Sequence, residues 1–255
     1  MSFDGPARAR LLGRIVSLGL LAALWQIAAL LAHSRTLPTV TAVLARLDEE
    51  IASGALPHHL GITLFRVACA FALSLLGGAA LGIALGSWRR LDLLFDGWLI
   101  AFVNLPALVI IVLAYIWLGM TEWAAIVAVA LNKLPSTAIL LREGTRALDP
   151  QLALMARAFR FGRWKSFRHV MLPQLTPYLL GASRSGLALI WKVVLVAEIL
   201  GRSDGVGFQI EVCFQLFDVA GILAYTIAFA LVVLGLEWIL LQPFERHMNR
   251  WRLAS

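Results

Sequence analysis

Six long apolar runs constrain this chain more than any other feature of its sequence. Each approaches the ~20 residues that a helix needs to cross the hydrocarbon core of a bilayer. Apolar residues make up 60% of the chain, more than an average soluble domain contains. The sequence therefore predicts an all-α polytopic membrane protein, with residues 1–255 forming a single transmembrane domain. Its six expected spans are approximately Ile15–Ala32, Leu60–Gly86, Trp98–Leu118, Trp123–Leu141, Pro177–Leu200 and Ala220–Leu241.

The distribution of Lys and Arg favours a topology with both termini in the cytoplasm. Cytoplasmic segments of membrane proteins are enriched in these residues, and this enrichment also explains the net charge of +7 without a nucleic-acid partner. The expected outer segments carry only Arg35, Arg46 and Arg202. The expected inner segments carry Arg8, Arg10, Arg14, Arg89, Arg90, Arg142, Arg146, Arg157, Arg160, Arg163, Lys165, Arg168, Arg246, Arg250 and Arg252. We expect a multi-pass protein of a bacterial cytoplasmic (inner) membrane.

Two patterns outside the apolar runs predict local structure. Thr39–Ser53 is polar and amphipathic, which favours an interfacial helix before the second span. Within that span, Gly78, Gly82 and Gly86 recur at a spacing that lets two helices approach closely. We therefore expect these glycines to serve helix packing.

The third and fourth spans contain residues that interrupt apolar helices. Asn104 and Pro106 interrupt the third span, and Asn132, Lys133 and Pro135 are expected to break the fourth. Proline frees backbone carbonyls and kinks helices, which membrane proteins tolerate where those groups meet protein or water. The interruptions favour either a lining for a pathway or curved packing, and the sequence leaves both open.

Ionisable residues inside spans are costly and usually face a cavity, another helix or the interface. Arg66 and Arg184 lie near span ends, so we expect their side chains to extend to the interface. Lys133 and Lys192 lie deeper, which leaves pathway lining and pairing with another helix open. Glu198 is six residues from Lys192, on a different helical face, so each needs another partner. The candidate pathway residues are Asn104, Lys133, Lys192 and Glu198; a cationic pathway would suit an anionic solute.

Residues 149–173 form a basic, amphipathic loop between the fourth and fifth spans. Asp149 and Pro150 are typical of a helix start, and Gly162 can end a helix in the left-handed conformation. The predicted helix, Pro150–Phe161, carries an apolar stripe with arginines beside it, and Leu172-Pro173 redirects the chain. Either anionic lipid or a groove on a soluble partner would accept such a helix. The stripe comprises Leu152, Met155, Ala156 and Phe159, and the arginines are Arg157, Arg160 and Arg163.

This loop and its surroundings resemble the permeases of binding-protein-dependent ABC importers, in the nitrate/sulfonate/taurine branch. The chain departs from that family's Glu-Ala-Ala start, where it has Leu154-Met155-Ala156, and from its glycine, where it has Arg160. The residues that carry the resemblance are Trp117-Leu118-Gly119, Glu122-Trp123, Arg163-Trp164, Phe167-Arg168, Val170-Met171-Leu172-Pro173, Pro177-Tyr178, Ala197-Glu198-Ile199-Leu200-Gly201 and Gly205-Val206-Gly207.

The resemblance implies the fold of a type I ABC importer permease, whose loop helix couples it to a cytoplasmic ATPase. The resemblance also implies the composition of the complex, which would contain two permeases, two ATPase subunits and an external substrate-binding protein. We expect the two permeases to form a homodimer surrounded by lipid. Glu198 would then have a structural or gating role. The coupling residues would be Asp149, Pro150, Met155, Ala156, Arg157, Phe159, Arg160, Gly162, Arg163, Leu172 and Pro173.

Other functional classes lack their sequence signals. The chain has no phosphate-binding G-x-x-x-x-G-K-[ST] motif, so we expect ATP and Mg²⁺ to be used by the partner ATPase and no cofactor to be bound here. Its histidines and two cysteines form no recognised metal motif, and no nucleophile–base pair suggests an enzyme. The alternative is an ion-coupled secondary transporter, for which inverted repeats and a buried acidic relay would be expected.

Overall fold

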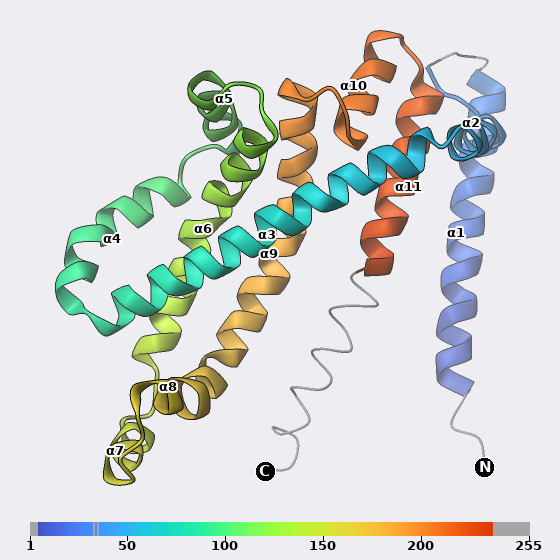
Figure 1. Ribbon diagram of the computed structural model, residues 1–255. Helices are drawn as coiled ribbons and strands as arrows, with labels where there is room; N and C mark the ends of the chain where they lie inside the picture. Colours follow the sequence, from blue (N-terminus) through green and yellow to red (C-terminus); the bar gives the residue numbers. More distant parts are fainter. Residues whose placement is uncertain (1–4, 33, 35, 237–255) are drawn as a thin grey trace.

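Figure 1 shows the computed structural model, which describes residues 5–32, 34 and 36–236. Within these ranges the chain is helical and contains no β-strand, which confirms the predicted all-α class. The helices are α1 (Gly5–Ala32), α2 (Val40–Ala52), α3 (Ala55–Ser87), α4 (Arg89–Val103), α5 (Ala107–Leu118), α6 (Glu122–Arg146), α7 (Pro150–Ala158), α8 (Arg163–Ser166), the π-helical η1 (Phe167–Met171), α9 (Leu172–Gly201), α10 (Val206–Gln215) and α11 (Val219–Leu236).

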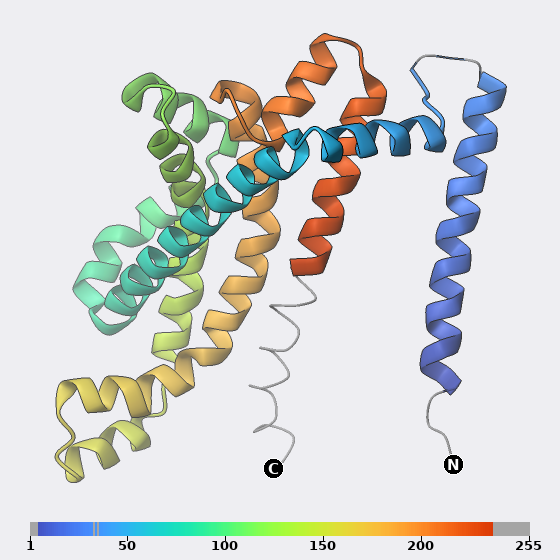
Figure 2. The same cartoon turned by 45° about the vertical axis from the view of Figure 1, so that its right-hand side comes forward.

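Helices α3, α6 and α9 form the packed centre of the molecule. Figures 1 and 2 show α4 and α5 beside this centre, α10 and α11 on its other side, and α1 standing apart next to α2. Helices α7 and α8 lie at one end, whereas α5 and α10 lie at the opposite end. The first residues of α1 lie toward the α7 end, and α11 runs toward it. The two ends therefore differ in the elements that they present.

Four helical runs are long and apolar enough to cross a membrane: α3, α6, the continuous run Arg163–Gly201, and α11. Helices α4 and α5 together meet the same criteria but are bent by 100° at their junction. The apolar part of α1, Val16–Ala32, is shorter. The prediction of six spans thus stays a prediction. The end of the predicted sixth span, with Pro243 and the basic residues Arg246, Arg250 and Arg252, lies outside the described residues.

Only one of the two expected interruptions breaks a helix. The break between α4 and α5 spans Asn104 to Pro106, as predicted, and the Asn104 side chain donates to the Ile100 carbonyl (2.7 Å). Helix α6, in contrast, continues through Asn132 and Pro135, so the predicted break in the fourth span is wrong. The physical reason is enclosure, because α6 packs against α3, α5 and α9, and neighbouring helices stabilise a proline-containing helix.

The interfacial helix predicted at Thr39–Ser53 forms as α2. The Thr39 hydroxyl accepts a hydrogen bond from the Ala42 N–H (3.2 Å) and caps the helix. Glu50 of α2 accepts a hydrogen bond from the Tyr225 hydroxyl of α11 (2.6 Å), which fixes α2 across the start of that helix.

Three glycines of α3 allow a close contact with α6 in the molecule's centre. A Cβ atom added to Gly78 or Gly82 would overlap atoms of α6. The Cβ added to Gly82 would lie only 2.8 Å from the Cβ of Leu141. A Cβ on Gly86 would lie 2.5 Å from Thr145 Cβ. The predicted packing role of these glycines is confirmed, since the backbones can approach only where side chains are absent.

We expect Gly82→Ala to destabilise the protein and Gly97→Ala to leave it unchanged. The added methyl at Gly82 meets α6 backbone and Leu141, whereas nothing lies within 4 Å of a Cβ at Gly97. Overpacking of this kind costs roughly 1–3 kcal/mol. The unfolding midpoint of the detergent-solubilised chain measures this, and equal midpoints for the two variants would contradict the packing role.

Candidate functional site

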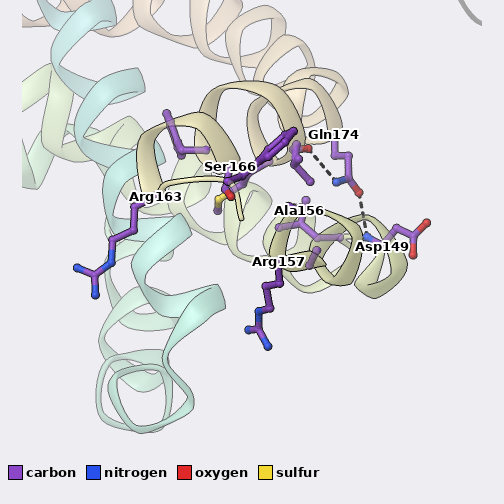
Figure 3. A pocket seen from close by; sticks show the side chains of 12 residues that line it. Asp149, Ala156, Arg157, Arg163, Ser166 and Gln174 are labelled. Carbon is purple, nitrogen blue, oxygen red and sulfur yellow. Dashed lines mark hydrogen bonds between the residues drawn. The ribbon is translucent and has the colours of Figure 1, made fainter. Parts of the chain in front are cut away.

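The loop at the α7 end is anchored to α9 by hydrogen bonds at its start. The Asp149 carboxylate accepts the Gln151 N–H (2.8 Å) and caps α7, as the sequence predicts. Gln174 of α9 accepts the Asp149 N–H (2.9 Å) and donates to the Val170 carbonyl (2.8 Å), as the dashed lines in Figure 3 mark. These hydrogen bonds connect the start of α7 to the first turn of α9.

Helix α7 ends earlier than predicted, and a different residue adopts the left-handed conformation after it. Helix α7 ends at Ala158, and Arg160 has a φ of 51°, in the left-handed region. The Phe161 N–H donates to the Ala156 carbonyl (2.9 Å) in the bonding pattern of a Schellman motif. Gly162 is extended and precedes the first residue of α8, so its predicted role as the left-handed terminator is wrong. The bonding pattern places the left-handed residue two positions earlier.

This geometry gives a physical reason for the family's glycine at the position of Arg160. A left-handed backbone is strained for residues with a side chain and unstrained for glycine. This chain thus has an arginine where the family pattern has a glycine, but Arg160 keeps the left-handed backbone that a glycine would favour.

Helices α7 and α8, η1 and the start of α9 line an open pocket of about 380 Å³, and the buried Ala156 forms part of its wall. The predicted apolar stripe divides at this point, because Met155 and Phe159 are exposed and only Ala156 faces inward. Figure 3 shows Arg157 and Arg163 pointing away from the pocket. Apolar and basic side chains are therefore both presented outward at this end.

The predicted exit from the loop lies at the start of α9. Leu172 and Pro173 form the first turn of this helix, directly after the π-helical η1. The ribbon changes direction there (Figure 2), although the helical run is continuous from Arg163 to Gly201.

At the opposite end, the Arg66 guanidinium lies in a network of carboxylates, only 1% exposed. It donates to Glu198 (2.8 Å) and makes two hydrogen bonds with Glu122 (2.8 and 2.5 Å). It also contacts the Asp204 carboxylate and donates to the Asp204 carbonyl (2.9 Å). The expected extension of Arg66 to the interface is wrong, because carboxylates from other elements compensate its charge within the protein. Arg202 adds a second cation, 2.6 Å from Glu122.

Glu198 organises the start of α10 within this network, which we call the Arg66 network. Its carboxylate accepts hydrogen bonds from the Thr63 hydroxyl (2.9 Å) and the Gly207 N–H (2.8 Å). Gly205 has a φ of 103°, and a Cβ there would overlap the Glu198 carboxylate. A Cβ on Gly207 would lie 2.7 Å from Glu198 Cβ. The Gly-Val-Gly motif thus lets the backbone close over a buried carboxylate.

A second ion cluster, which the sequence interpretation missed, joins α4 to α6. Arg142 contacts Asp96 (2.5 Å) and Asp92 (3.1 Å), and Arg146 also pairs with Asp92. The signal was present in the spacing, since the two aspartates and the two arginines are each four residues apart and share a helix face.

The structure does not bring the four candidate pathway residues together. Asn104 is exposed at the α4–α5 bend, and Glu198 is enclosed in the Arg66 network. Lys133 is buried between α6 and α9, where it donates to the Ser185 hydroxyl (3.3 Å). Lys192 is exposed on α9 and lines a groove beside α11. Pathway lining by these residues stays a prediction.

Among the described residues, no group of His, Cys, Asp and Glu has an arrangement that could hold a metal ion. Cys69 and Cys213 are free thiols, and burial raises the pKa of the Cys213 thiol above its ordinary value.

We expect Arg66→Met to destabilise the protein by roughly 3–5 kcal/mol, because it leaves the buried Glu198 carboxylate uncompensated. Adding Glu198→Gln should restore part of that loss, since Glu122 and Asp204 are partly exposed and can meet water. Unfolding midpoints in detergent measure both effects, with the exposed Arg90→Gln as the control. A double variant no more stable than Arg66→Met would argue against the network.

The chain is similar in sequence to known transport proteins. Residues 56–242 match the family described as binding-protein-dependent transport system inner membrane component. A Bacillus subtilis protein assigned to aliphatic sulfonate transport as a permease is 32% identical over 90% of this chain and 84% of its own length. The taurine transport system permease protein of Escherichia coli is 25% identical over 76% of this chain and 70% of its own length. The bicarbonate transport system permease protein of Synechococcus elongatus is 28% identical over 76% of this chain and 68% of its own length. The chain therefore belongs to the family of binding-protein-dependent transport system inner membrane components, the permease subunits of ABC importers.

Proposed function

We propose that this chain works as one half of a homodimeric permease, coupled to two cytoplasmic ABC ATPase subunits through residues 149–173. The observation that carries this proposal is the outward display of apolar and basic side chains on a loop tied to α9. The side chain of Phe159 is 72% exposed and that of Trp164 equally so, with Arg157 and Arg163 nearby. Exposed aromatic and arginine side chains are typical anchors of protein interfaces.

The same geometry suggests how movement of the ATPase reaches the membrane. The run Arg163–Gly201 is helical throughout its 39 residues and changes direction at the start of α9. Its first part binds α7 through Gln174, and its last part carries Glu198 of the Arg66 network. A shift of α7 on closure of the ATPase dimer would therefore reorient one continuous helix between both ends of the permease.

In this proposal the α7 end faces the cytoplasm and the Arg66 network lies toward the outer side of the inner membrane. The chain crosses the membrane six times, with both termini in the cytoplasm and lipid around it, and catalyses no reaction. ATP and Mg²⁺ bind to the separate ATPase, and an external binding protein delivers the solute near α5 and α10.

We propose an anionic solute of low molecular mass. Relatives carry names that refer to aliphatic sulfonates, taurine and bicarbonate. Lys133 and Lys192 place positive charge within the helices of this chain, which suits an anion. An acidic relay of the kind expected in an ion-coupled carrier is not favoured, because Glu198 is held by Arg66, Thr63 and Gly207.

We expect the double variant Arg157→Glu, Phe159→Ala to lower co-purification of the ATPase roughly tenfold or more, because it removes an aromatic anchor and reverses a charge. Met120→Ala is the matched control, since Met120 is an exposed apolar residue at the opposite end. The ATPase recovered per permease from detergent extracts is the measurement. Undiminished recovery with the double variant would argue against docking through α7.

A further inference from the structure

Helix α9 carries two basic residues on the face that borders α11. Arg184, Ala188 and Lys192 recur every four residues, so they lie on one face over about 12 Å of helix. All three residues are exposed. They line a groove of about 300 Å³ between α9 and α11, together with the rings of Trp191 and Phe229.

The position of Lys192 requires water or a charged partner. Lys192 lies nine residues before the end of α9, about 14 Å along a helix that is long and apolar enough to span the membrane. A charged side chain at such depth is expensive against lipid and faces a cavity or a counter-charge. Within residues 5–32, 34 and 36–236, no carboxylate forms an ion pair with Lys192. Lys133 differs, because it is buried and hydrogen-bonded to Ser185.

The wall of the groove supplies the second part of a binding site. The rings of Trp191 and Phe229 meet edge to face with their centroids 5.8 Å apart, and both residues are mostly buried. They thus form an apolar wall of the groove that Lys192 also lines. An apolar wall with one or two charged groups is the usual composition of a small-molecule site.

We infer that the groove between α9 and α11 binds the solute during transport, with Lys192 contacting its anionic head and Trp191 and Phe229 contacting a short apolar part. The chemical class is a small organic anion, such as a sulfonate or carboxylate with a few carbon atoms. This inference rests on the proposed function, and it assigns the solute-contacting residues within the pathway.

A thiol placed in the groove tests its water access and its charge directly. Cys69 and Cys213 are first replaced by Ala, and Ala188→Cys is introduced between Arg184 and Lys192. The complete transporter in nanodiscs, nucleotide-free or ATP-bound, is treated with an anionic (2-sulfonatoethyl) or a cationic (2-trimethylammonioethyl) methanethiosulfonate. Each rate is divided by that of the same reagent with free cysteine.

We expect the anionic reagent to react roughly tenfold faster than the cationic reagent in at least one of the two states, because positive charge lies near the introduced cysteine. Lys192→Gln should lower this preference several-fold, Lys192→Arg should retain it, and Arg90→Gln at the exposed α3–α4 turn should leave it unchanged. Failure of both reagents to react in both states would show that lipid or protein seals the groove and would overturn the inference. So would a preference that Lys192→Gln leaves intact.

Uptake measurements separate this inference from the proposed function. Proteoliposomes with the ATPase and the binding protein are tested with ethanesulfonate. We expect Lys192→Gln to lower ATP-dependent uptake about tenfold while ATPase co-purification stays normal, with Lys192→Arg retaining uptake. Equal uptake by Lys192→Gln and the unmodified chain would overturn the groove assignment and leave the importer function standing. A permease that never retains an ATPase would overturn the proposed function, while the thiol rates of the permease alone in nanodiscs would still decide whether the groove is open to water and positively charged.

Discussion

The buried charge of Arg66 is the constraint on which the arrangement of the helices depends. A guanidinium within an apolar span needs compensating carboxylates, and here they come from three separate elements: Glu122 on α6, Glu198 on α9 and Asp204 in the loop before α10. Because these carboxylates lie on different elements, the ion network ties α3 to α6, to α9 and to the loop before α10. It also positions the backbone of Gly207, whose N–H binds Glu198.

The close contact between α3 and α6 provides the complementary constraint near the α7 end. Gly82 and Gly86 let the two backbones approach, and Arg142 then reaches Asp92 and Asp96 on α4. Lipid supplies no hydrophobic force between helices, so packing and polar contacts determine their arrangement. The centre of the permease is therefore held at both ends, while α9 connects the two ends and carries the anchoring residue Gln174 toward α7.

Much of the fold could be predicted from local patterns, and the errors arose where a neighbouring helix changed the outcome. The break near Asn104 formed because proline ends a helix whose neighbours do not enclose it. The break expected near Pro135 did not form, because α6 is surrounded. Arg66 was expected to reach the interface because it lies near a span end. The expectation failed because its partners are distant in the sequence and only the tertiary fold brings them near. In the loop, the helix start at Asp149 was predictable from its cap, but the left-handed residue was Arg160 rather than Gly162.

The sequence by itself determined the apolar helices, the basic loop and the glycine spacing, because these follow from hydrophobic length, charge and the periodicity of a helix. Its motifs also pointed to the family. Only the tertiary structure decided which charges are compensated inside the protein and which line a groove. Arg66 and Lys192 are both cations within apolar runs, and the sequence placed Arg66 nearer a span end and Lys192 deeper. One is enclosed by carboxylates and the other lines a groove, since burial and pairing depend on which helices pack together.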